Sequence, residues 1–137
     1  MTTDRPSPLA HPLRACARGV HPAEAGVELL IEHGTFLRRD DFRARFVDTT
    51  LTDDTQTAEI NWSKAITALN NQTLACSGGE ARILRLAASI AVGIPVNLRD
   101  ALTGLDTTNI ERLTRAILHA NGRRTLSAPS HEDPRSS

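Results

Sequence analysis

The longest apolar stretch of the chain covers residues 76–93, and its pattern predicts the central helix of the protein. Three polar residues, Arg82, Arg85 and Ser89, recur at intervals of three and four and therefore share one narrow stripe. The rest of the circumference is apolar, so other elements must cover this helix on nearly all sides. We expect a compact bundle packed around a helix over residues 78–92.

The sequence also predicts where this helix begins and ends. Ser77 and Glu80 have the spacing of a capping box, in which each side chain accepts a hydrogen bond from the other residue's backbone N–H. Gly93 suits the left-handed position that closes a helix, and Pro95 excludes a further turn. Start and stop are therefore predicted independently of the apolar pattern.

Shorter periodic segments predict the other helices, giving an all-α bundle of about five helices. Each segment pairs an apolar stripe with a start or stop signal: Asn97 is expected to cap a short helix, and Thr108 with Glu111 to form a second capping box. The segments are residues 21–34, 41–46, 61–69, 97–104 and 108–120. The residues predicted to lie in the core are Trp62, Leu84, Leu86, Ile90, Leu102, Leu113 and Ile117.

The remaining segments lack helical periodicity. Residues 48–59 are rich in Thr and Asp and are expected to form an exposed connection, and the nearest strand candidate, 58–62, is too short to build a sheet. Residues 1–19 contain three prolines with little apolar material, and residues 123–137 are rich in Ser, Pro and charge. We expect two disordered tails and one domain over residues 20–122.

Charge and cysteine content narrow the class of protein. The chain has 16 basic and 16 acidic residues, so no global field draws it to nucleic acid or to an anionic membrane. Two cysteines are too few for a disulfide framework, and the N-terminus lacks the apolar run of a signal peptide. No segment is long and apolar enough for a membrane span. These features favour a cytoplasmic protein without membrane contact.

Several segments are similar to one group of proteins. The stretches Gly-Val-Glu-Leu-Leu-Ile, Leu-Arg-Arg-Asp-Asp-Phe-Arg-Ala-Arg-Phe-Val, Ile-Asn-Trp, and Cys-Ser-Gly-Gly-Glu through Asn-Leu-Arg-Asp-Ala-Leu-Thr-Gly-Leu-Asp resemble small, uncharacterised proteins of GC-rich actinobacteria. The resemblance covers roughly residues 24–124. Its motifs are helix caps and core stripes, so it implies a shared helical architecture and no functional site.

Candidate enzyme chemistry is sparse. Cys-Ser-Gly-Gly-Glu looks like the signature motif of ABC-type ATPases, but the only lysine, Lys64, lies outside any phosphate-binding loop, so no nucleotide site is expected. The start of the central helix could lower the pKa of Cys76 and make it a nucleophile, although a cysteine packed as a small hydrophobe explains the same residue. No His or Cys pair has the spacing of metal ligands, and no cofactor is expected.

The clearest functional pattern lies near the C-terminus. Two short helices over residues 98–105 and 108–120 are joined by a very short turn, which is typical of a helix-turn-helix. The residues expected to face DNA are Thr108, Asn109, Arg112 and Arg115. Against this interpretation, Asp100 occupies a position where the motif prefers a small residue, and an ordinary helical hairpin predicts nearly the same pattern.

Because caps and core positions account for most distinctive residues, the sequence favours a small non-catalytic domain that acts through protein–protein interaction, with a protein partner or with itself. A DNA-binding regulator that uses residues 97–122 is the alternative. An enzyme built on Cys76 is a weaker one.

Overall fold

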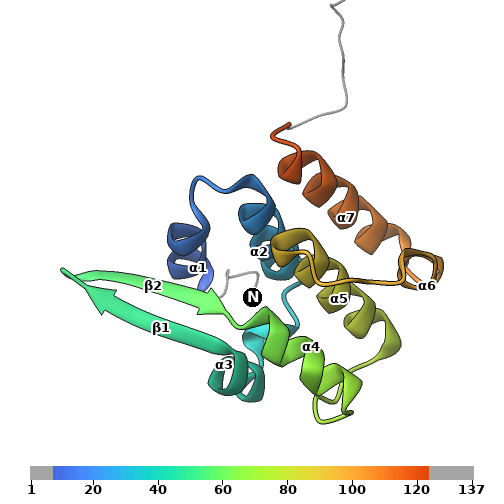
Figure 1. The fold of residues 1–137 in the computed structure, drawn as a ribbon, viewed down its shortest axis with the longest axis horizontal. Coiled ribbons are helices and arrows are strands. Elements are labelled where there is room, and N and C mark those ends of the chain that lie inside the picture. The colour runs from blue at the N-terminus through green and yellow to red at the C-terminus, as the bar shows by residue number, and fades with distance from the viewer. Residues whose placement is uncertain (1–7, 124–137) are drawn as a thin grey trace, which may run out of the picture.

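The computed structural model describes residues 8–123, which form seven α-helices, one 3-10 helix and one β-hairpin (Figure 1). The expectation of an all-α bundle of about five helices is confirmed in part: the described residues are mostly helical, but they form seven α-helices and also a small two-stranded sheet. In chain order the elements are α1 (Ala10–Ala17), α2 (His21–His33), η1 (Phe36–Arg38), α3 (Asp40–Phe46), β1 (Val47–Thr52), β2 (Thr55–Ile60), α4 (Trp62–Asn70), α5 (Gly78–Val92), α6 (Leu98–Thr103) and α7 (Thr107–Ala120).

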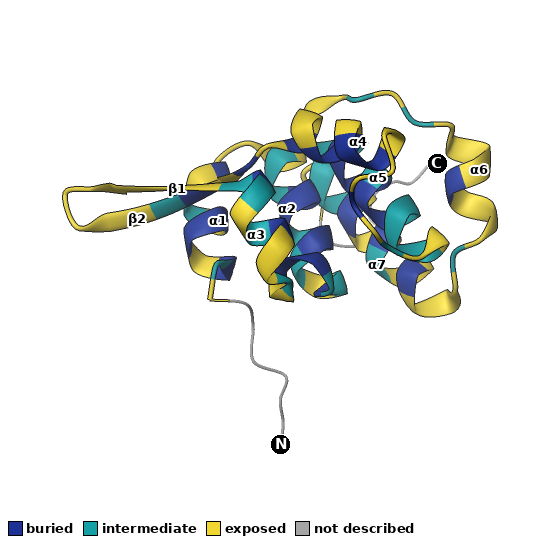
Figure 2. Cartoon of the chain, turned by 90° about the horizontal axis from the view of Figure 1, so that it is seen from below, coloured by how far each residue is buried: buried dark blue, intermediate teal, exposed yellow. Residues whose placement is uncertain are grey.

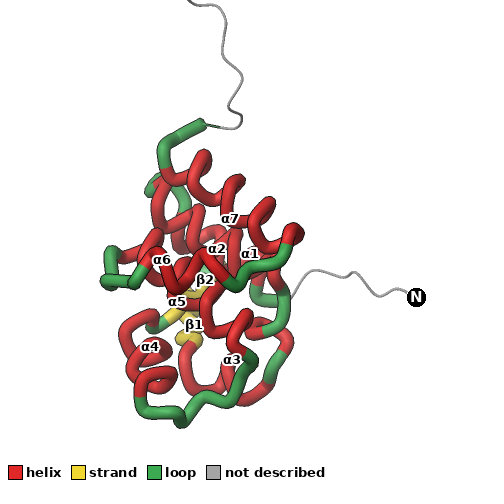
Figure 3. Tube along the Cα trace, turned by 90° about the vertical axis from the view of Figure 1, so that its right-hand side faces the viewer, coloured by secondary structure: helices red, strands yellow, loops and turns green. Residues whose placement is uncertain are grey.

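Helix α5 runs through the middle of the molecule and contacts α2, α4, α6 and α7 (Figures 1 and 3). Ser77 caps it: the Ser77 hydroxyl accepts from the backbone N–H of Glu80 at 3.1 Å, and the Glu80 carboxylate accepts from the Ser77 N–H at 2.8 Å. Gly93 closes it in the left-handed conformation, with φ of 78°. The local signals therefore set both ends of the central helix.

The polar stripe of α5 connects it to its neighbours. Nε of Arg82 donates to the backbone carbonyl of Asp100 in α6 at 3.2 Å. Arg85 donates to the side-chain oxygen of Asn70 at the end of α4 at 2.9 Å. The two arginines on an otherwise apolar helix thus hold the helices packed on either side of it.

Three phenylalanines form a column beside this core. The ring centroids of Phe36 and Phe42 lie 5.1 Å apart, as do those of Phe42 and Phe46, and all three side chains are buried. Such tilted ring pairs add to the free energy gained by burial. The column fixes η1 and α3 against the bundle.

The hairpin β1–β2 corrects the expectation of an exposed connection over residues 48–59. The two strands pair antiparallel from Val47 opposite Ile60 to Thr52 opposite Thr55. Alternate residues of β2, Ala58 and Ile60, are buried, and α1 packs against this strand. Threonine suits a pleated and partly exposed surface, so a Thr-rich segment without helical period is stable here as a ribbon. Figure 1 shows the hairpin extending beyond the helices.

Helix α1 corrects the expectation of a tail over residues 1–19, because residues 10–17 are helical and pack on α2 and β2. Ala10, Leu13 and Ala17 lie on one buried face, and Leu13 is only 1 % exposed. Pro12 is tolerated because it lies in the first turn, where a backbone N–H has no partner within the helix. Residues 1–7 and 124–137, which hold the rest of the predicted tails, lie outside the described residues.

The start of α7 differs from the predicted one. Its N-cap is Asp106, whose carboxylate accepts from the backbone N–H of Asn109 at 2.8 Å, so Thr108 and Glu111 do not form a capping box. An acidic side chain one position before the first helical residue also suits the positive end of the helix dipole, which favours the earlier start. Asn97 does cap α6, through the backbone N–H of Asp100.

The predicted core residues have three different environments. Trp62, Leu84, Leu86 and Leu113 are buried, and Ile90 is half-buried. Leu102 and Ile117, however, are 37 % and 56 % exposed, so their assignment to the core is wrong. Figure 2 shows that most of α6 is exposed. For Ile117 the reason is the rotation of α7, which buries Asn109, Leu113 and Ala116 instead. In α6 the buried residue is Ala101 rather than Leu102.

Candidate functional site

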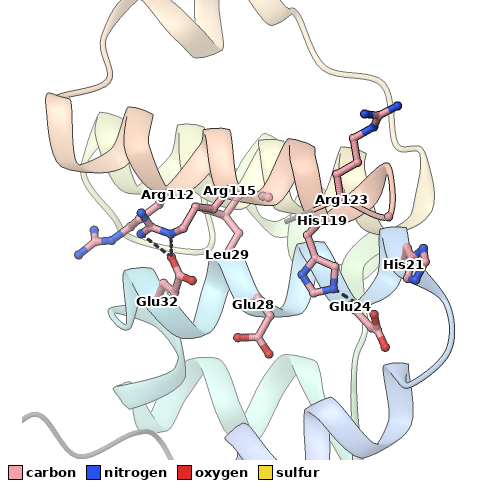
Figure 4. Close-up of a pocket in the computed structure, with 11 residues that line it drawn as sticks. His21, Glu24, Glu28, Leu29, Glu32, Arg112, Arg115, His119 and Arg123 are labelled. Carbon is pink, nitrogen blue, oxygen red and sulfur yellow. Dashed lines mark hydrogen bonds and ion pairs between the residues drawn. The ribbon is translucent and has the colours of Figure 1, made fainter. Parts of the chain in front are cut away.

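A groove with a volume of about 460 Å3 lies between α2 and α7 (Figure 4). Three glutamates of α2, at every fourth residue from Glu24 to Glu32, lie along one wall, because four residues bring a helix back to nearly the same face. Arg112, Arg115 and His119 of α7 lie along the other wall. An acidic row therefore faces a basic row.

The three carboxylates of this groove are all engaged. Glu32 accepts from Arg115 at 2.8 Å, and Glu24 lies 3.0 Å from Nε2 of His119. Glu28 instead accepts from Arg14 of α1, at 3.0 Å. The groove is thus balanced in charge, and its polar groups mainly hold α1, α2 and α7 together.

The hydrogen bonds of Glu24 lower the pKa of its carboxyl group. Its carboxylate accepts a hydrogen bond from the backbone N–H of Gly19 at 2.9 Å in addition to its contact with His119. Both interactions favour the charged form, so the pKa of Glu24 lies below its usual value, with the Gly19 bond the larger cause. A carboxylate that stays charged suits an ion pair better than the transfer of a proton near neutral pH.

The described lining of the groove contains two histidines, His21 and His119, with ring centroids 6.4 Å apart. Among residues 8–123, no serine, threonine or cysteine lines it. Within residues 8–123, no group of three His, Cys, Asp or Glu side chains is arranged to hold a metal ion. The hydrogen bonds and ion pairs between Glu24 and His119 and between Glu32 and Arg115 join α2 to α7.

The four residues expected to face DNA do not form one exposed surface. Asn109 is buried, and its side-chain oxygen accepts from Arg112 at 2.9 Å. Arg115 is paired with Glu32, and both arginines line the groove towards α2. Thr108 alone of the four is exposed and unconnected to this network. A duplex that bound both guanidinium groups would compete with Glu32 of α2 for Arg115 and with Asn109 for Arg112.

Cys76 lies half-buried directly before the cap of α5. Burial raises the pKa of the Cys76 thiol, and the charge of Glu80 raises it further, while Arg39 and Arg85 have a smaller opposing effect. This direction is the reverse of what a reactive thiolate requires. The position instead suits a small apolar residue next to a helix start.

The outer face of α7 is exposed and uncharged along its length. Five exposed residues recur at intervals of three and four along the whole helix, and none of them is charged. We call this set the α7 stripe: Thr107, Ile110, Thr114, Ile117 and Asn121. Its two isoleucines are 38 % and 56 % exposed. On the preceding α6, Leu98 and Leu102 are also exposed.

Sequence reasoning missed both features, although the signals were present. The glutamates of α2 have a spacing of four, and the α7 stripe has the alternating intervals of a helix that packs against another helix. The sequence pattern does not indicate which face of α7 packs against α2.

Comparisons add no family to this description. No protein-family model, curated protein or solved structure matches the chain. Among the described helices, none has the length and apolar character needed to cross a membrane.

Proposed function

We propose that the protein is a non-catalytic interaction domain that acts in the cytoplasm by binding protein through the outer face of α7. The observation that carries the proposal is the exposure of Ile110 and Ile117 within the charge-free α7 stripe. Single exposed aliphatic residues are common on protein surfaces, but aliphatic residues aligned on one helix face are typical of a helix that docks against a partner.

Two further observations support this function. Exposed aliphatic residues also occur on α6, directly before α7 in the chain, so the apolar surface is concentrated in the C-terminal helices. The charged residues of α7 lie off the stripe: Arg115 is held by Glu32, and Arg112 by Asn109. A partner that covers Ile110 and Ile117 therefore need not remove water from either arginine.

The alternatives receive less support. Burial of Asn109 and pairing of Arg115 with Glu32 count against a recognition helix that reads DNA through α7. The raised pKa of the Cys76 thiol counts against a reactive cysteine. DNA binding through Arg112 and Arg115 would show itself as retention of a duplex that weakens steeply with salt.

Site-specific photo-cross-linking in living cells tests the proposal. A photoreactive amino acid replaces Ile117 in one variant and Leu51 in a control, because Leu51 is even more exposed, at 71 %, but lies on the hairpin. We expect a discrete protein adduct from position 117 and none from position 51. Adding Ile110→Lys to the first variant should sharply reduce the adduct. Absence of an adduct at 117, or equal adducts at both positions, would contradict the proposed surface.

A further inference from the structure

The order of residues in the α7 stripe is close to a palindrome. The centre of the stripe is Thr114, an isoleucine lies on each side of it, and a small polar residue lies at each end. Ile110 precedes Thr114 by four residues and Ile117 follows it by three, so the two isoleucines are nearly equidistant from the centre. A two-fold contact between two copies of this surface therefore places isoleucine beside isoleucine.

From this symmetry, and resting on the proposed interaction function, we infer that the partner is a second copy of this chain, bound through α7 in an antiparallel, two-fold symmetric contact. The symmetry axis passes close to Thr114, so that Ile110 of each copy lies beside Ile117 of the other. Each isoleucine then packs against an isoleucine of the other copy, and Thr107 of one copy lies near Asn121 of the other.

Charge supports a self-contact of this geometry. The stripe contains no charged residue, and the whole chain has zero net charge, so two copies do not repel each other. Glu111 borders the stripe, and in the antiparallel arrangement it lies near Leu118 of the other copy rather than near a second Glu111. Antiparallel helices also place the positive end of each helix dipole beside the negative end of the other.

The central residue can be buried without losing a hydrogen bond. The Thr114 hydroxyl donates to the backbone carbonyl of Ile110 at 2.8 Å, so it already has a partner inside its own helix. Burial of an unsatisfied hydroxyl would oppose association, and here that cost is avoided. One helix stripe is smaller than a standard protein interface, so we expect a dimer of micromolar affinity.

Cysteine cross-linking tests both the contact and its direction. In a Cys16→Ser, Cys76→Ala background, single variants Thr114→Cys, Ile110→Cys and Ile117→Cys are oxidised, and melting curves verify that each one folds. Thr114→Cys should form a disulfide-linked dimer. Ile110→Cys and Ile117→Cys should each remain largely monomeric alone and cross-link to each other when mixed. Efficient self-linking of Ile110→Cys would indicate parallel helices and overturn the inference.

Sedimentation of the wild type over a wide concentration range supplies the second measurement. We expect a monomer–dimer equilibrium. Ile117→Lys should raise its dissociation constant at least about tenfold, because it replaces a buried apolar side chain by a charged one in both copies. Leu51→Lys is the matched control and should leave the equilibrium unchanged. A wild type that stays monomeric throughout overturns self-association. If position 117 still yields a photo-adduct with a different protein, the proposed interaction function survives that result.

Discussion

Gly26 of α2 packs directly on Ala91 of α5. A Cβ atom added at Gly26 would lie 2.6 Å from the Cβ of Ala91 and 2.7 Å from the backbone oxygen of Ala87. Both approaches are too short for ordinary contact, and backbone is not free to yield. The close crossing of the two helices therefore depends on a residue without a side chain, and it fixes how deeply α2 sits on the central helix.

Gly26→Ala should accordingly be destabilising, by about 1–3 kcal/mol, because the added methyl group overpacks the crossing. Gly79→Ala is the matched control: it lies in the first turn of α5, and nothing lies within 4 Å of an added Cβ. Alanine favours the helix there, so this variant should be neutral or slightly stabilised. Urea unfolding of both variants checks the comparison, and an unchanged midpoint for Gly26→Ala would refute the close-packing account.

The rotation of α7 predicts a contrast between two residues that the sequence pattern treats alike. Leu113→Ala should cost about 2–5 kcal/mol, because Leu113 is buried against the bundle. Ile117→Ala should cost less than about 1 kcal/mol, because more than half of Ile117 is already in solvent. Equilibrium denaturation at concentrations where the protein is monomeric measures both. Large and similar costs for the two variants would mean that α7 packs through the face predicted from periodicity alone, and the reverse order would contradict the observed burial of Leu113.

That contrast shows where sequence reasoning succeeded and where it failed. The central helix was predictable to its ends because Ser77, Glu80 and Gly93 act locally, within one turn of each boundary. The buried face of α7 depends on tertiary packing. Ile110, Leu113 and Ile117 all fit an apolar stripe, and only the position of α2 selects a face centred on Asn109, Leu113 and Ala116.

Two elements were missed for different reasons. The prolines of the first 19 residues suggested a tail and concealed the periodic Ala10, Leu13 and Ala17 of α1. The hairpin lacked the Asn-Gly signal that normally identifies a two-residue turn. At the candidate site, the sequence identified Arg112 and Arg115 as functional side chains but could not show that Glu32 of α2 would pair with one of them.

The hairpin turn offers a way to stabilise the protein. Asp53 and Asp54 connect Thr52 and Thr55, and their φ angles of 50° and 66° are those of a type I′ turn. Aspartate tolerates this conformation less well than asparagine or glycine. The double variant Asp53→Asn/Asp54→Gly should gain about 0.5–1 kcal/mol. Asp53→Ala/Asp54→Ala removes the same charges and should lose stability, so a gain of equal size in both variants would show that charge, not turn geometry, matters.

His33 should make stability depend on pH. Its Nδ1 is buried without a hydrogen-bond partner among residues 8–123, and burial, aided by the nearby charge of Arg112, lowers the pKa of His33 below its ordinary value of 6.5. Glu80 and Asp106 oppose this shift only in part. The unfolded chain therefore binds a proton before the folded protein does, and stability that is complete above about pH 6.5 declines as the pH falls towards the folded pKa.

Replacing this histidine isolates its contribution. His33→Phe keeps an aromatic ring beside Phe36 and cannot titrate. We expect the wild type to lose more unfolding free energy than His33→Phe between about pH 7.5 and about pH 5.5. His11→Phe serves as the control at an exposed histidine and should retain the wild-type dependence. Parallel pH profiles for the wild type and His33→Phe would contradict the assignment of a neutral buried imidazole.

We expect the α7 stripe to be exposed in the isolated protein and covered by a partner in the cell. The most direct test is the alkylation rate of a cysteine that replaces Ile117 in the Cys16→Ser, Cys76→Ala background. Leu51→Cys in the same background is the control. In dilute purified protein both cysteines should react rapidly, since both positions are exposed. Inside cells we predict that Ile117→Cys becomes strongly protected while Leu51→Cys remains reactive. Equal reactivity of the cysteine at 117 in cells and in dilute solution would contradict the account.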